Sequence, residues 1–90
     1  MMPLDGNSTQ RTLTDVTAAI RTVLDQPDLD LTLASSLEDI PNWDSMDLIA
    51  VVVELECRYD ILFELPQIDS FARVGDMVRA VAAKCHLRAA

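Results

Sequence analysis

Aromatic residues and glycine are scarce in this chain of 90 residues, which contains one Trp, one Tyr, two Phe and two Gly. The strands and turns of β-rich domains draw on both kinds of residue, so the shortage argues against a β-rich fold. The apolar half of the sequence consists mainly of Leu, Val, Ile and Ala, which suits packed helices. A chain of this length forms one domain with a modest core and has little room for an active-site cleft of its own.

Cysteine and long apolar runs are also few. Cys57 and Cys85 lie 28 positions apart without a C-x-x-C pair, which argues against a disulfide framework or a zinc site. No apolar run reaches the length of a membrane span, and Met1 to Gln10 lacks the basic and apolar segments of a secretion signal. We therefore expect a cytoplasmic protein with reduced thiols and no membrane span.

Basic side chains are outnumbered, with 7 Lys and Arg against 15 Asp and Glu, for a net charge of −8. Such a charge on a small body repels the phosphates of nucleic acids and of anionic lipids. Nucleic acid and membrane surfaces are therefore poor partners, whereas basic protein surfaces are favourable ones.

The apolar periodicity predicts an all-α fold, with three principal helices, one short helix and a long loop between the first and second helices. The principal helices are expected at about 9–26, 45–59 and 74–85, and the short one near 66–71. We expect a flexible lead-in over residues 1–8 and a flexible tail over residues 86–90. The domain itself is then expected to span residues 9–85.

The long connection from Pro27 to Asp44 is rich in aliphatic residues. An alternation at Leu29, Leu31 and Leu33 is compatible with a short strand, but the chain offers no second strand to pair with it. We predict instead a loop held to the core by its aliphatic side chains, which also include Leu37 and Ile40. Ordered loops of this length are often functional.

The segment 45–59 carries two apolar stripes. One stripe faces the core and contains Leu48, Val51, Val52, Leu55 and Tyr59. The other contains Met46, Ile49, Ala50, Val53 and Cys57. Either the helix is buried on two sides under the long loop, or the second stripe is an exposed docking surface.

The sequence shows no arrangement of residues that is typical of a catalytic or metal-binding site. The only histidine is His86 near the C-terminus, and Ser45 does not lie in a G-x-S-x-G turn. Neither metal-ligand spacing nor a glycine-rich phosphate loop is present. The sequence therefore predicts neither an enzyme nor a metal site.

Ser45 stands out by its position at or beside the start of the helix 45–59. A serine and an aspartate there can serve simply as a helix cap. A phosphate ester on the hydroxyl would also be favoured, because free N–H groups and the helix dipole attract negative charge.

The motif Asp44-Ser45-Met46 resembles the D-S-L motif of acyl carrier proteins. Tyr59-Asp60-Ile61 is similar to the aromatic-Asp-Ile that closes the second helix of this family, and Val74-Gly75-Asp76 to the V-G-D that opens its last helix. The resemblance covers about residues 10–83.

This resemblance implies a carrier in which Ser45, beside Asp44, accepts 4′-phosphopantetheine from coenzyme A. The arm holds an acyl group as a thioester for enzymes of a fatty-acid, polyketide or other dedicated pathway. The implied partners of the monomer are a phosphopantetheinyl transferase, an acyl-loading ligase or transferase and downstream enzymes with basic patches. The implied docking residues are Met46, Ile49 and Val53, with Asp44, Asp47 and Glu56. The implied acyl pocket is lined by Val52, Leu55, Tyr59, Phe63, Ile68 and Phe71.

Departures from the family pattern bear on the cargo. Ala50, Cys57 and Arg58 stand where fatty-acid carriers often have glutamate, which favours a specialised partner. Phe63 and Phe71 stand where smaller residues are usual, which predicts a smaller acyl pocket. Two alternatives stay open: Met46 also occurs in D-alanyl carriers, which allows an aminoacyl cargo, and a cofactor-free helical interaction module is the third interpretation.

Overall fold

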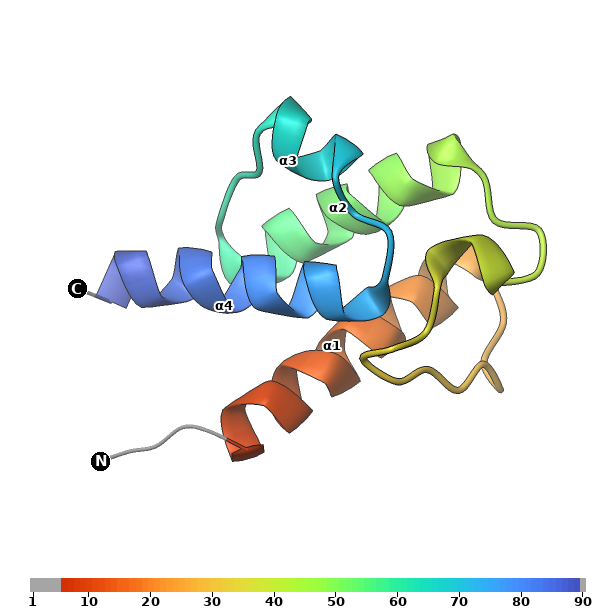
Figure 1. The fold of residues 1–90 in the computed structure, drawn as a ribbon, viewed down its shortest axis with the longest axis horizontal. Coiled ribbons are helices and arrows are strands. Elements are labelled where there is room, and N and C mark those ends of the chain that lie inside the picture. Colours follow the sequence, from red (N-terminus) through yellow and green to blue (C-terminus); the bar gives the residue numbers. More distant parts are fainter. Residues whose placement is uncertain (1–5, 90) are drawn as a thin grey trace.

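The computed structural model describes residues 6–89, with side chains for residues 9–85, and it is all-helical (Figure 1). Within these residues the one pairing of strand type is an isolated bridge between Ser36 and Arg73. The predicted all-α fold of three long helices, one short helix and a long loop is confirmed. The helices in chain order are α1 (Gly6–Leu24), the 3-10 turn η1 (Leu37–Asp39), α2 (Ser45–Tyr59), α3 (Leu65–Asp69) and α4 (Val74–Ala89).

The three long helices pack on one another, with α1 in contact with both α2 and α4. The short helix α3 lies on the opposite side of the molecule from α1 (Figure 1). The start of α1 and the end of α4 lie at one end of the molecule, and the α1–α2 loop fills the other end (Figure 1). The loop and the start of α2 are thus kept away from the chain ends.

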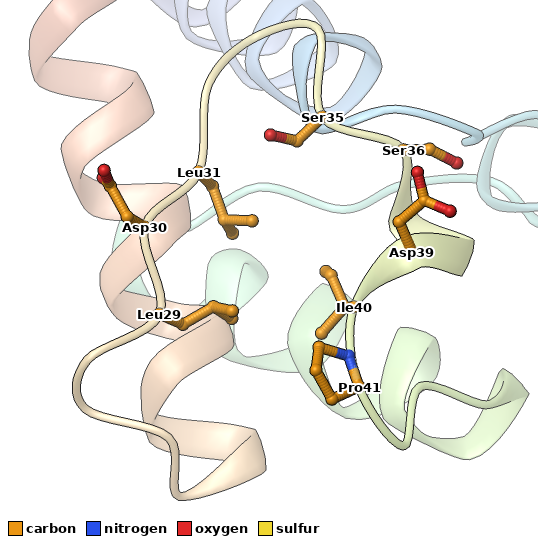
Figure 2. A pocket seen from close by; sticks show the side chains of 8 residues that line it. All are labelled: Leu29, Asp30, Leu31, Ser35, Ser36, Asp39, Ile40 and Pro41. Atoms are coloured by element: carbon orange, nitrogen blue, oxygen red, sulfur yellow. The ribbon is translucent and has the colours of Figure 1, made fainter.

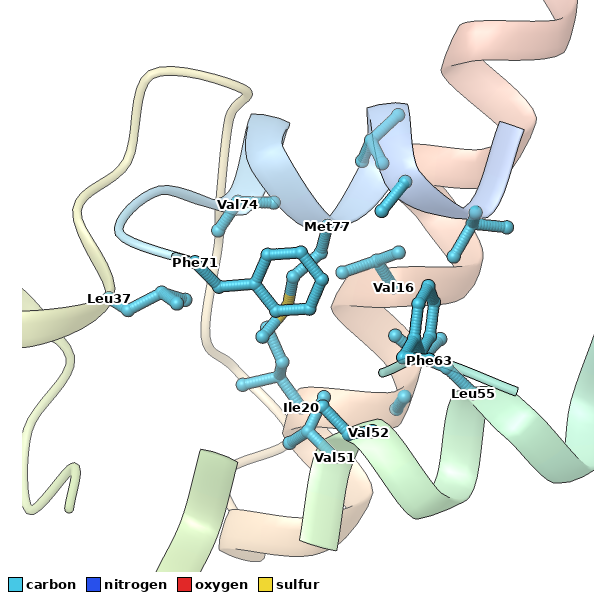
Figure 3. Packing of buried hydrophobic residues seen from close by; sticks show 14 of the residues in the cluster. Val16, Ile20, Leu37, Val51, Val52, Leu55, Phe63, Phe71, Val74 and Met77 are labelled. Atoms are coloured by element: carbon cyan, nitrogen blue, oxygen red, sulfur yellow. The ribbon is translucent and has the colours of Figure 1, made fainter. Parts of the chain in front are cut away.

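The core is one apolar cluster to which every helix and the loop contribute (Figure 3). The rings of Phe63 and Phe71 meet edge to face inside it, with centroids 5.7 Å apart and planes at 87°. Burying a side chain of this kind contributes roughly 1.5–3 kcal/mol. The fully buried members are Val16, Ala19 and Ile20 of α1, Val51, Val52 and Leu55 of α2, and Val74, Met77 and Val81 of α4.

Both terminal helices are longer than predicted. α1 begins at Gly6 instead of Thr9, and α4 continues to Ala89 instead of ending near Cys85. Residues 6–8 and 86–89 are therefore helical. No proline follows Gly75, and the last residues are mostly good helix formers, so nothing stops α4 earlier. Residues 1–5 and 90 lie outside the described part, and the flexibility expected over residues 1–8 and 86–90 stays a prediction.

The α1–α2 loop is held to the core by Leu31, Leu37 and Ile40, which are buried, and by Leu29, which is partly buried. Leu33 was expected to join them, but its side chain is 39% exposed. At this position the backbone makes the contact, because the Leu33 carbonyl accepts a hydrogen bond from the Gly75 amide at 2.9 Å.

That bond is one of several that join residues 33–37 of the loop to residues 72–75, and we call this set the loop clasp. A side chain at Gly75 would disturb it, since a Cβ there would lie 2.7 Å from the Leu33 carbonyl oxygen. The other bonds of the clasp are Leu37 N–H to Ala72 O at 3.0 Å, Val74 N–H to Ser35 O at 2.9 Å and Arg73 Nη1 to Ala34 O at 2.8 Å.

Candidate functional site at the start of α2

The first turn of α2 is fixed by a reciprocal capping box. Asp44 is the N-cap residue, and its Oδ1 accepts a hydrogen bond from the Asp47 amide at 3.0 Å. The Asp47 Oδ2 in turn accepts from the Asp44 amide at 3.0 Å. Each carboxylate thus satisfies a backbone donor that would otherwise lack a partner. Ser45 therefore lies beside the cap, as the first helical residue, and its side chain is exposed.

The end of the α1–α2 loop forms a turn that places Ser45 at the surface. Asn42 adopts a left-handed backbone conformation with φ of 65°, which asparagine tolerates better than most residues. The next residue, Trp43, donates its amide to the Ile40 carbonyl at 3.1 Å and packs against the core. The chain thus turns sharply just before the capping box.

The two stripes of α2 differ in their exposure to solvent. Val51, Val52 and Leu55 are buried. The second stripe lies in solvent, with Met46 73% exposed, Ile49 44% and Val53 51%, and Ala50 and Cys57 are exposed as well. The loop therefore does not cover the second stripe, and the interpretation of a helix buried on two sides is wrong.

The acidic side chains of α2 are largely bound within the protein. Asp47 belongs to the capping box, and Glu54 forms an ion pair with Arg58 at 2.9 Å. Glu56 was expected to face partners, but it is partly buried and its Oε2 accepts a hydrogen bond from the Phe63 amide at 2.9 Å. Glu56 thereby ties α2 to the connection that follows it. No periodicity signals this role, because the donor is a backbone amide.

The residues expected to line an acyl pocket do come together. Val52, Leu55, Phe63 and Phe71 are buried in the core cluster (Figure 3). Ile68 is buried there as well, and Tyr59 packs against the cluster. Two surface hollows lie elsewhere: one within the α1–α2 loop (Figure 2), and one beside α3 and α4 that only Phe71 of this group borders. The six residues thus lie together at the place where the resemblance implies a pocket.

Tyr59 also links α2 to α1 through a polar contact that the sequence did not reveal. Its hydroxyl donates a hydrogen bond to Oδ2 of Asp15 at 2.5 Å. Burial of the ring and the bond to this carboxylate raise the pKa of Tyr59 well above its ordinary value. The contact joins residues 44 positions apart, so periodicity alone could not identify it.

Asp76, in the predicted V-G-D motif, organises the start of α4. Its Oδ2 accepts hydrogen bonds from the amides of Ala72 and Arg73, both at 2.9 Å, and Oδ1 binds Arg79. The two amide donors hold the pKa of Asp76 below its ordinary value. This aspartate therefore supports the loop clasp from the α4 side.

Other candidates contribute little to this site. Cys57 and Cys85 are free thiols, and the side chain of His86 lies outside the described residues. Among the side chains of residues 9–85, no group of three or more His, Cys, Asp or Glu could hold a metal ion. No helix in the described part of the chain is long and apolar enough to cross a membrane.

Comparisons with known proteins agree with this geometry. The family model described as "Phosphopantetheine attachment site" matches residues 14–81. An acyl carrier protein of Exiguobacterium sibiricum is 32% identical over 69 residues, which are 77% of this chain and 87% of the relative. Another from an Exiguobacterium species is 29% identical over 75 residues, which are 83% and 95% of the two chains.

A solved structure is similar as well. The holo acyl carrier protein of Geobacter metallireducens matches with a TM-score of 0.79 and 33% identity, over 87% of this chain and 90% of that one. Shared fold, shared sequence and the family match lead to the same conclusion. The chain belongs to the acyl carrier protein family, whose cofactor is covalently attached 4′-phosphopantetheine.

Proposed function

We propose that Ser45 carries the 4′-phosphopantetheine arm and that the chain delivers acyl groups on it to partner enzymes. The observation that carries this proposal is the position of Ser45, exposed at the first residue of α2 and directly after the capping Asp44. An attacking hydroxyl must reach into the active site of another enzyme, and an exposed first helical residue does so with little rearrangement.

The residues at this position suit a phosphodiester. Negative charge is stabilised at a helix N-terminus by the dipole and by the first amides. Asp44 and Asp47 are the nearest acids along the chain, and each is bonded to the other's amide. In the attachment reaction, Ser45 Oγ bonds to the phosphorus next to the pantetheine, the bond to 3′,5′-ADP breaks, and the serine proton passes to a base of the transferase. Once attached, the arm presents a terminal thiol that holds an acyl group as a thioester.

The exposed stripe of α2 supports a docking role. Met46, Ile49 and Val53 face solvent at i, i+3 and i+7, which is the pattern of a helix that lies in an apolar groove of a partner. Asp44 and Asp47 lie at the end nearest Ser45, whereas Glu56 is bound to the Phe63 amide. We therefore assign the apolar contact to the stripe and only a minor part to Glu56.

The cargo is proposed to enter between Val52, Leu55, Tyr59, Phe63, Ile68 and Phe71. Phe63 and Phe71 pack edge to face among these residues, so a bulky cargo would have to move at least one ring. A short or compact acyl group disturbs this packing least. The arrangement thus favours a dedicated pathway over one that carries long fatty-acyl chains.

We propose a monomeric cytoplasmic carrier that is not itself a catalyst, since its family transports groups between enzymes. The partners are the phosphopantetheinyl transferase, a loading ligase or transferase, and the enzymes that process the acyl group. An aminoacyl cargo is the second candidate, favoured by Met46 after the serine.

The experiment incubates the protein with coenzyme A and a phosphopantetheinyl transferase and measures the intact mass. We expect the mass of one phosphopantetheinyl group on the wild type and none on Ser45→Ala. No added mass with several transferases would favour the cofactor-free interaction module. Addition that persists in Ser45→Ala would move the site. Loading assays with acyl and aminoacyl ligases then distinguish the two cargo classes.

A further inference from the structure

The negative charge of this chain is concentrated in one segment. Residues 22–57 contain no Lys or Arg, so this segment carries a formal charge of −9 and the rest of the chain +1. The segment comprises the α1–α2 loop and most of α2. Its acids are Asp25, Asp28, Asp30, Glu38, Asp39, Asp44, Asp47, Glu54 and Glu56.

The acidic side chains of the α1–α2 loop differ from those of α2 in their hydrogen bonds and ion pairs. Asp47, Glu54 and Glu56 of α2 are bonded to groups of the protein. The ion pairs among the described residues are Glu54–Arg58 and Asp76–Arg79, and neither involves a loop acid. Asp30 and Asp39 are exposed in the loop. The free negative charge therefore lies on the loop and not on the exposed stripe of α2.

The same loop encloses a hollow of about 210 Å³ between its two limbs (Figure 2). Its apolar wall consists of Leu29, Leu31, Ile40 and Pro41, whose side chains point into the space between the limbs (Figure 2). Asp30 and Asp39 line it from opposite limbs, with the Asp30 carboxylate turned away from the space between the limbs and the Asp39 carboxylate turned toward Ser36 (Figure 2). The hollow thus has an apolar wall and two carboxylates at its rim.

An apolar wall next to carboxylates suits a long cationic side chain of a protein partner. The volume is below the roughly 300–1,000 Å³ of small-molecule pockets, so a single side chain of a protein partner fits better than a free ligand. Lys and Arg have an aliphatic stem that packs on apolar surface and a cationic head that binds carboxylates. A lysine or arginine side chain therefore matches both the wall and the acids.

The hollow lies within reach of an enzyme that acts on Ser45. Four steps of about 3.8 Å between consecutive Cα atoms limit Pro41 to about 15 Å from Ser45. A stable protein partner covers about 800 Å² on each side, which is a disc of roughly 16 Å radius. A partner centred on Ser45 can therefore reach Pro41 at the edge of the hollow.

We propose that the α1–α2 loop is the electrostatic docking site of the phosphopantetheinyl transferase, and that a Lys or Arg of this enzyme packs its stem on the apolar wall of the hollow while its cationic head binds Asp30 and Asp39 at the rim. The apolar contact is then made by α2 and the ionic contact by the loop. The inference rests on the proposed role of Ser45 and adds a second contact surface to it.

The test compares D30N/D39N with D28N/E38Q. Both variants remove two exposed loop acids, but Asp28 and Glu38 do not line the hollow. The rate of phosphopantetheine attachment is measured with a transferase and coenzyme A at low and high NaCl. We expect kcat/KM of D30N/D39N to fall about tenfold at low salt with kcat unchanged, and its salt dependence to flatten. D28N/E38Q should stay within about threefold of the wild type.

Equal losses in the two variants would overturn the hollow as a specific site, since net charge alone would then explain them, and unchanged rates would overturn the loop as a docking site. Intact mass at saturating transferase separates this result from the proposed function, because all three proteins should still gain the arm on Ser45. As a second readout, agmatine should shift the amide resonances of Leu31, Ser36 and Ile40 in the wild type and D28N/E38Q but not in D30N/D39N. Shifts in D30N/D39N equal to those of the wild type would contradict the proposal.

Discussion

At the scale of single residues, the bond from Tyr59 to Asp15 gives a direct test of how α1 and α2 are joined. Tyr59→Phe keeps the ring in place and leaves a partly buried carboxylate without this donor. Because hydrogen bonds to charged groups contribute about 1.5–3 kcal/mol, we expect the free energy of unfolding at pH 7 to fall by about 2 kcal/mol. Urea denaturation followed by circular dichroism measures the difference.

The same bond predicts a pH dependence. The folded state raises the pKa of Tyr59, so the stabilisation is complete below the unfolded value of about 10 and is lost as the pH rises above it. The advantage of the wild type over Tyr59→Phe should therefore narrow between pH 9.5 and 11. A constant difference over this range would show that the hydroxyl is not held in its protonated form by the fold.

Gly75 is the residue whose size the fold restricts most directly. In Gly75→Ala the new Cβ would lie 2.7 Å from the Leu33 carbonyl oxygen, so the backbone of the loop must shift. We expect a loss of about 1–3 kcal/mol in the free energy of unfolding, as for other overpacked sites. Since alanine is favoured over glycine in a helix by about 1 kcal/mol, an increase in stability would show that the close approach carries no cost.

At the scale of the elements, one face of α2 is buried in the core and the other is the proposed docking surface, so the two roles can be tested separately. Val53→Asp changes the exposed stripe only, so stability should change by less than about 1 kcal/mol. The kcat/KM for arm attachment should fall about tenfold, because a charge would enter an apolar contact. Ala82→Asp, at an exposed position of α4, is the matched control and should leave the rate unchanged. Equal effects of the two changes would exclude a docking role for the stripe.

The two faces of α2 also show what the sequence predicts well. A period of 3.6 residues is enough to assign Val51 and Leu55 to the core, and Asp44 with Ser45 marks the helix start. Whether the second stripe is covered could not be decided, because that depends on the path of a loop without periodicity. The role of Glu56 was missed for a related reason, since its partner is a backbone amide that has no signature in the sequence.

The α1–α2 loop shows a second limit of prediction from the sequence. Its aliphatic positions at Leu31, Leu37 and Ile40 were correctly expected to anchor it, since apolar side chains in an ordered segment are usually buried. Leu33 is an exception, because it contacts α4 through its backbone carbonyl, which accepts a hydrogen bond from the Gly75 amide in the loop clasp, and its side chain stays exposed. Bonds between backbone atoms distant in the chain follow from tertiary packing, which no local pattern specifies.

At the scale of the whole molecule, the uneven charge predicts a response to salt. Like charges in residues 22–57 repel one another and destabilise the compact state. Raising NaCl from 0.01 to 1 M shortens the screening length from about 30 to about 3 Å, so we expect the free energy of unfolding to rise by about 1 kcal/mol. Thermal or urea unfolding across this series measures the change.

The control for this effect is a variant in which Asp28, Asp30, Glu38 and Asp39 are all made neutral amides. It should be more stable than the wild type at low salt and should gain less stability as NaCl is added. A salt response identical to that of the wild type would show that the repulsion lies outside the loop.

The loop clasp has one more consequence, for the cooperativity of folding. The first amides of a helix have no acceptor within the helix, and those of Val74 and Gly75 at the start of α4 are bonded to the Ser35 and Leu33 carbonyls. The loop that leads to Ser45 is therefore also the cap of α4, so the two should open together as one unit. Amide hydrogen exchange at Val74 and Gly75 then reports the opening of a loop that lies some 40 residues earlier in the chain.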